Sequence, residues 1–462
     1  MFNECVSLTE LNLSGWLIDK VTSIKYMFSE CVSLTKLDIS NFNASNTEIT
    51  SMFNNCNVLT DLTAYDKRIL NEYNKDIRVL SESKNNFNTA DYTDNENDII
   101  SHNDIHGIIQ TPENKKQLRD LIKKRLKKDP ENPYLSDIDV RLIKNMESLF
   151  NGDEYGYIKM LDLSNWDTSE VTTMANMFKN LRWLERVKLS NKFNTSKVKN
   201  MSGMFQNCNS LKILDLSNFD TSKAKTMENM FMGCELINDL DLSSFDTSKV
   251  ENMDQMFLNC SFLVNLNISS FNTSKVKYMG HMFAKCRALE KLSIKQFNTS
   301  NVIDMQYMFL LCDSLEKLDL SNFDTSKVKN MAYMFYSCDL LKKLDLSNFD
   351  TSKVDTMYGM FANCSSLEKI DVSNFDTSNV VNMNVMFANC IALKKLDLSS
   401  FDTRKAVEMV CMFDGCKNLN TLNLTNATTG KPHHLTCIFR NCSSLKNLIT
   451  DDKNLLIMKS YI

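Results

Sequence analysis

The sequence has little glycine and proline, with 10 and 4 of these residues in 462. Chain reversals must therefore use Asn, Asp and Ser, whose short side chains hydrogen-bond nearby backbone groups. No run approaches the roughly 18 apolar residues that a membrane-spanning helix needs. The start, from Met1 to Ser7, has neither a basic nor an apolar segment, so we expect no export signal there.

Strong net charge and catalytic motifs are also missing. The 53 Lys and Arg nearly balance the 57 Asp and Glu, and this argues against nucleic acid or membrane insertion as a mode of action. A glycine-rich phosphate loop, a GxSxG elbow and an HExxH motif are all absent, and five His leave few general bases. We therefore expect no enzyme, no cofactor and no resident metal. With 43% hydrophobic residues, the chain can still bury a large core.

A 26-residue repeat dominates the sequence. A Phe preceded by Met, Leu or Ile recurs in strict register from Phe205 to Phe439. The cleanest copy, from Leu341 to Cys364, reads LKKLDLSNFDTSKVDTMYGMFANC, and the consensus is LxxLDLSNFDTSKVxxMxxMFxxC. A unit this short cannot bury its own apolar face, so neighbouring coils must stack into one continuous core. The repeat therefore predicts a solenoid.

Each coil has two halves with different patterns. Leu344-Asp345-Leu346 alternates apolar and polar residues, as a half-buried strand does. A turn follows at Asp350-Thr351-Ser352, and apolar residues then recur at spacings of three and four, which favours a short helix: Val354, Met357, Met360, Phe361 and Cys364. We predict an α/β repeat solenoid with one short parallel strand and one short helix per coil.

The repeat phrase carries a family resemblance. LxxLxL at the start of a 20- to 29-residue unit resembles a leucine-rich repeat, and LDLSNFDTSKVxxMxxMFxxC resembles the BspA-like leucine-rich repeat surface proteins. The resemblance implies a surface or secreted bacterial protein engaged in adhesion or host contact. Phe219, Phe323 and Phe349 stand where such repeats usually carry Asn or Cys, so we expect a Phe spine there. An intracellular protein–protein interaction scaffold is the alternative, favoured by the missing export signal and the unpaired cysteines.

The repeat pattern predicts five segments. Residues 1–63 form a short array that starts in mid-repeat, as a truncated array would, and residues 64–111 form a polar linker or insertion. An amphipathic capping helix and its connection occupy residues 112–135. The main array of about 12 coils spans residues 136–450, and residues 451–462 form a C-terminal cap.

Most of the 15 cysteines occupy one fixed position in the repeat, which accounts for their number. Thirteen lie three residues after a repeat Phe, where a free Cys packs as a small buried hydrophobe. Cys411 and Cys437 instead precede their Phe by two residues, and whether they pair across adjacent coils stays open. CxxC spacing is absent, and His433 and His434 lie in a degenerate loop, so we expect no metal site there.

Outward strand positions supply the candidate binding face. Asp recurs there in a column, and its charge is offset by Lys343, Lys369 and Lys395, by a cation or by a basic partner. A second Asp column, which includes Asp350, precedes Thr-Ser and has a local role in the turn. We expect a protein or glycoprotein ligand to contact the outward residues of the central coils: Asp319, Ser321, Asp345, Ser347, Asp371, Ser373, Asp397 and Ser399.

Overall fold

The chain folds into two compact units, Met1–Ile100 and Ser101–Ile462. The computed structural model describes residues 109–429 and 432–461 and, nearer the N-terminus, residues 2, 5–16, 18, 21–40, 42, 44, 47–54, 56, 59, 61–64, 68, 69, 72 and 73. The linker predicted for residues 64–111 lies largely outside the described residues.

The first unit is a short stack of coils. Its strands β1 (Glu10–Asn12), β2 (Lys36–Asp38) and β3 (Asp61–Thr63) pair in parallel in that order. Phe2 stacks on Phe28 with ring centroids 5.7 Å apart. Because adjacent strands differ by 25 or 26 residues, each strand begins a new coil.

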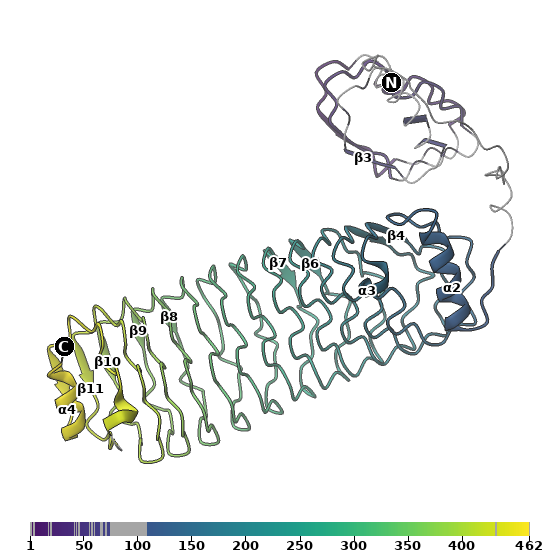
Figure 1. Cartoon of the computed structure of the whole chain (residues 1–462). Coiled ribbons are helices and arrows are strands. Elements are labelled where there is room, and N and C mark those ends of the chain that lie inside the picture. The colour runs from purple at the N-terminus through teal and green to yellow at the C-terminus, as the bar shows by residue number, and fades with distance from the viewer. Residues whose placement is uncertain are drawn as a thin grey trace, which may run out of the picture. The chain divides into compact units, whose positions relative to one another are not determined.

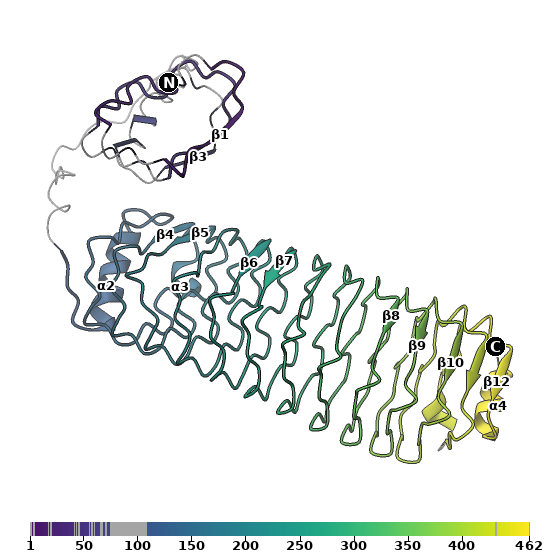
Figure 2. The same cartoon turned by 180° about the vertical axis from the view of Figure 1, so that it is seen from behind.

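The second unit is a long solenoid, with strands of successive coils side by side (Figures 1 and 2). Helix α2 (Lys115–Leu126) covers one end and α4 (Lys453–Lys459) the other, and between them lie the short helices α3 (Gly152–Tyr155) and η1 (Pro432–Leu435). Paired strands are parallel and 26 residues apart, so the leucine-rich-repeat-like solenoid is confirmed. The strands are β4 (Met160–Asp162), β5 (Arg186–Lys188), β6 (Asp239–Asp241), β7 (Asn265–Asn267), β8 (Lys343–Leu344), β9 (Lys369–Ile370), β10 (Lys395–Asp397), β11 (Thr421–Asn423) and β12 (Asn447–Ile449).

The second half of each coil is a run of turns, so the predicted short helix is wrong. The Met334 N–H bonds within the coil to the Met331 carbonyl (3.3 Å), whereas the Phe335 N–H reaches the Met360 carbonyl of the next coil (2.9 Å). In a helix, both N–H groups would donate to carbonyls four residues earlier in the same coil. Here alternate donors join neighbouring coils, and parallel bridges from Asn145 to Glu408 form a second ladder along the array.

The backbone also excludes a helix because two positions in most of these turn runs are left-handed. Gly359 (φ 58°) and Asn363 (φ 61°) occupy them in one coil. Glycine and Asn tolerate this conformation, whereas a Cβ of ordinary shape is crowded by the following carbonyl. Val385, at φ 51°, is a β-branched residue at the position that Gly359 occupies one coil earlier.

Replacing Val385 with Asn should therefore raise the free energy of unfolding by about 1 kcal/mol, because it relieves left-handed strain at a β-branched residue. Urea denaturation of the two proteins measures the difference. Val381→Asn is the matched control, since Val381 is exposed and its φ is not positive. Equal effects of the two substitutions would show that backbone strain is not the cause.

The core of the second unit contains stacked aromatic rings and a column of thiols. Phe335 lies between Phe309 and Phe361, with centroids 5.6 and 5.7 Å away and rings within 8° of parallel. Buried Cys338 donates its Sγ–H to the Phe309 carbonyl at 3.2 Å. Twelve of the thirteen Cys that follow a repeat Phe are buried, as predicted, and Cys5 is half-buried.

The expected Phe spine is also present. Phe219, Phe323 and Phe349 are all buried, and Phe219 stacks between Phe193 and Phe245 with centroids 6.0 and 6.4 Å away. Aromatic packing thus replaces a hydrogen-bonded side-chain ladder at this position.

The turn residues Asp-Thr-Ser join neighbouring coils instead of starting a helix. Asp350 Oδ1 accepts the Ser352 N–H at 2.9 Å, which is the local role predicted for this Asp column. The buried Thr351 hydroxyl donates to the Asp376 carbonyl of the next coil, also at 2.9 Å. Each buried Thr therefore adds a hydrogen bond between coils.

Candidate binding face

A groove of about 880 Å³ lies over the strand face from β8 to β11. Its floor is formed by the inward strand residues Leu344, Ile370 and Leu396. Outward residues on either side of that floor give it charged walls: Lys343, Lys369, Lys395, Asp345, Asp371 and Asp397. Since the three coils are in register, each charge recurs at the spacing of paired strands, about 4.8 Å.

The structure brings five of the eight predicted residues together in this groove: Asp345, Asp371, Ser373, Asp397 and Ser399. Asp319 lines a neighbouring hollow of about 390 Å³, together with Lys295 and Lys317. Ser321 and Ser347 are exposed on the same face but line neither hollow.

The predicted site residues include four aspartates, and each has a structural role that the sequence did not reveal: Asp319, Asp345, Asp371 and Asp397. Oδ1 of Asp345 accepts the Ser347 N–H at 3.0 Å, and Asp371 and Asp397 make the same bond to Ser373 and Ser399 at 3.0 and 2.9 Å. These bonds end the strand in a tight turn. They also hold the pKa of each carboxyl below its usual value, so all three are charged at neutral pH.

Asp319 forms the same turn with an additional hydrogen bond and an ion pair. It accepts both the backbone N–H and the hydroxyl of Ser321, at 3.1 and 2.7 Å, and it pairs with Lys295 at 3.2 Å. The Ser321 hydrogen bonds, with a smaller contribution from Lys295, lower the pKa of Asp319 to about 2. Asp319 is therefore less available to a partner than Asp345 or Asp371.

The central lysines and aspartates do not neutralise one another directly. On the same face, Lys188 pairs with Asp162 across neighbouring coils at 3.2 Å. Within residues 109–429 and 432–461, by contrast, no ion pair involves Lys343, Lys369 or Lys395. The groove thus presents rows of both signs that a partner can contact.

Exposed apolar residues also lie in the coils toward the N-terminal end of the second unit, and the sequence did not predict them. Trp183 and Phe262 are each 58% exposed and hold the same position in their coils, immediately before the first Leu. Tyr157 holds that position in the coil before Trp183 and is 75% exposed. An aromatic residue at an outward position of the repeat is the sequence feature that could have revealed them.

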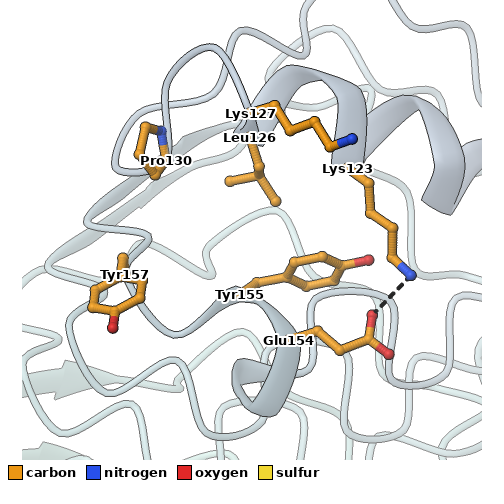
Figure 3. A pocket seen from close by; sticks show the side chains of 7 residues that line it. All are labelled: Lys123, Leu126, Lys127, Pro130, Glu154, Tyr155 and Tyr157. Carbon is orange, nitrogen blue, oxygen red and sulfur yellow. Dashed lines mark ion pairs between the residues drawn. The ribbon is translucent and has the colours of Figure 1, made fainter.

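Tyr157 also borders a hollow of about 460 Å³ where α2 meets α3 (Figure 3). Leu126 and Pro130 give it an apolar wall, and Lys123 forms an ion pair with Glu154 at 3.4 Å. Burial raises the pKa of the Tyr155 hydroxyl in this hollow. The hollow therefore offers a small amphipathic surface beside the exposed Tyr157 side chain.

In the part of the chain that the structure describes, no group of three or more His, Cys, Asp or Glu side chains could hold a metal ion. None of the described helices has the length and apolar character needed to cross a bilayer. The side chain of His433 lies outside the described residues.

Comparison with known proteins identifies the repeat. A family model described as "Mycoplasma protein of unknown function, DUF285" matches residues 1–94, 123–238, 185–291, 261–343 and 339–452. The chain belongs to the DUF285 family. These matches include repeats of both units, and the curated proteins contain no match. The more specific resemblance to BspA-like proteins stays a prediction.

Solved structures similar to this DUF285 chain come from several bacteria. A leucine-rich cell surface protein of Faecalibacterium prausnitzii is 18% identical, with a TM-score of 0.38, and the match covers 67% of this chain and 84% of that one. A leucine-rich repeat protein of Bacteroides ovatus is 16% identical (TM-score 0.39; 69% and 82% covered). The pneumococcal vaccine antigen PcpA is 15% identical (TM-score 0.31; 68% and 67% covered).

Proposed function

We propose that this DUF285 protein is a non-enzymatic binding scaffold whose strand face contacts a protein or glycoprotein ligand. The observation that carries the proposal is the groove over β8 to β11, where three lysines and three aspartates lie in register without ion pairs among the described residues. Repeated charges of both signs favour a partner with complementary charges at several points. Such multivalent contact needs no catalytic group.

We further propose that the contact is bacterial surface adhesion or host contact, on the resemblance of the repeat phrase to surface proteins. A second candidate is an intracellular interaction scaffold that uses the same face. The observation that favours it is that the structure shows no disulfide among the described cysteines, as in proteins of reducing compartments. Protease treatment of intact source cells separates the two candidates: release of array peptides without lysis supports adhesion, and protection until lysis supports the scaffold.

The double substitution Asp345→Asn with Asp371→Asn tests the groove. Asn keeps the Oδ1 acceptor that ends each strand and removes only the charge, so circular dichroism should be unchanged. Surface plasmon resonance on immobilised fibronectin, laminin, fibrinogen and mucin measures binding. We expect wild-type protein to bind at least one of them and the double variant to bind it about tenfold or more weakly, a change of about 1.4 kcal/mol.

Asp215→Asn with Asp241→Asn is the matched control. These aspartates bond Ser217 and Ser243 at 3.0 and 2.9 Å in the same way, but they lie outside the groove. The control should bind like wild type, and an equal loss in both double variants would mean that total charge, not the groove, drives binding. If wild-type protein bound none of the four glycoproteins, adhesion to this class of ligand would be wrong.

A further inference from the structure

Cys411 and Cys437 differ from the other cysteines of the second unit. They hold the same position in successive coils, two residues before Phe413 and Phe439, and both are half-buried. Cys416 and Cys442, five residues further along the same two coils, are fully buried. The two coils therefore contain one accessible and one inaccessible pair of aligned thiols.

Earlier coils of the array show how side chains in this column are stacked. His281, Tyr307 and Tyr333 occupy the same position, and their rings stack at 4.5 and 5.0 Å. All have left-handed backbone like that of Cys411 (φ 53°) and Cys437 (φ 57°), so side chains in the column leave the backbone in the same direction. The Cys411 N–H donates to the Thr436 carbonyl at 2.9 Å, which places the two coils in direct contact here. Disulfides need Cα atoms about 4.4–6.8 Å apart, and the spacing of about 4.8 Å between adjacent parallel segments lies within that range.

The outer pair, Cys411 and Cys437, is the one that a small reagent can reach. Burial raises the pKa of Cys411, and the interaction with the neighbouring Cys437 thiol adds to that increase. Cys437 opens onto a hollow of about 500 Å³ beside Arg440 and Met458, which admits a small thiol reagent. Cys442 is fully buried. Burial raises its pKa to about 12, and its Sγ–H donates to the Phe413 carbonyl at 3.0 Å. Thiol exchange needs a thiol that the reagent can reach, and of these two pairs only the outer one is partly exposed.

We propose that Cys411 and Cys437 form a disulfide between adjacent coils when the protein meets a low-molecular-weight disulfide such as oxidised glutathione. The Cys437 thiol loses its proton and attacks one glutathione sulfur, the glutathione S–S bond breaks, and the released glutathione thiolate takes up a proton. The Cys411 thiolate then attacks the Cys437 sulfur and displaces the second glutathione. Two protein thiols are oxidised to one disulfide, and one glutathione disulfide is reduced to two thiols.

The bond would close a loop of 26 residues at the C-terminal end of the array. The last coil has another coil on one side only and the short helix α4 on the other, so it should open more readily than central coils. A covalent bond between the coils of Cys411 and Cys437 would hold this end closed wherever the surroundings are oxidising.

Intact mass measurement of the full chain tests the proposal after incubation with oxidised glutathione. The tested protein and its variants carry Cys5→Ser, because Cys5 is half-buried and its thiol could compete; fourteen of the fifteen cysteines then remain. We expect a loss of two hydrogen masses, twelve titratable thiols after denaturation, and one cross-linked peptide pair containing Cys411 and Cys437. Cys416 and Cys442 serve as the internal control and should stay reduced.

Cys411→Ser provides the second measurement. Without its partner, Cys437 should retain one glutathione as a stable mixed disulfide, because the second displacement cannot occur. Two results would overturn the proposal: both thiols remain reduced in the parent protein, or each retains its own glutathione without cross-linking.

Discussion

Replacing Phe335 with Ala should lower the free energy of unfolding by about 3–5 kcal/mol and loosen the adjacent coils before the rest of the array. The Phe335 side chain is fully buried between the parallel rings of Phe309 and Phe361. Its loss leaves a cavity that the regular coil spacing cannot close. Because each coil contacts only its two neighbours, the damage should stay local.

Hydrogen exchange along the chain measures this effect. Faster exchange is expected in the coils of Phe309, Phe335 and Phe361, with distant coils unchanged. Leu340→Ala in the same coil is the control, since its side chain is 45% exposed and should cost less than about 0.5 kcal/mol. Uniform acceleration over the whole second unit would contradict nearest-neighbour stability.

A single methyl group at Gly152 should be nearly as damaging, with a cost of about 3 kcal/mol. A Cβ there would lie 1.8 Å from the Asn180 carbonyl oxygen and 2.8 Å from the Leu181 nitrogen. These are backbone atoms of the next coil, so they cannot rotate aside as a side chain can. The Gly152 N–H also donates to the Lys179 carbonyl at 2.8 Å, and the clash would break this bond. Gly152→Ala should therefore separate α3 from the coil beneath it.

Urea unfolding followed by tryptophan fluorescence reports the change, because buried Trp166 stacks on Phe150 at 5.8 Å at this end of the second unit. Gly15→Ala is the control, since nothing lies within 4 Å of the added atom. An unchanged midpoint for Gly152→Ala would mean that α3 can move away at little cost.

The sequence predicted the coil period, the inward Leu and Phe positions and the buried thiols, because spacing along a repeat is also spacing along the stack. It wrongly predicted a helix in the second half of each coil. Met357, Met360, Phe361 and Cys364 are spaced as on a helix face, but a run of turns can bury the same residues. The deciding signal was present in the sequence as Gly359 and Asn363, which suit left-handed backbone.

The groove over the strand face was only partly predictable. Alternation in the strand marked Asp345 and Asp371 as outward, and the structure places both in the groove. Their bonds to Ser347 and Ser373 depend on side-chain geometry that a pattern of residue types does not contain. Exposed Trp183 was not predicted because the prediction rested on the repeat consensus, which leaves out residues that depart from the consensus in single coils.

The hydrogen bonds between coils, on the strand side and on the turn side alike, run along the stacking direction. A pulling force applied to the two ends of the second unit would therefore load these bonds one coil after another, in series. A released coil of 26 residues extends to about 90 Å, whereas in the stack it contributed about 5 Å. Under load the second unit should therefore lengthen in steps, while the coils still in place keep the groove over β8 to β11 intact.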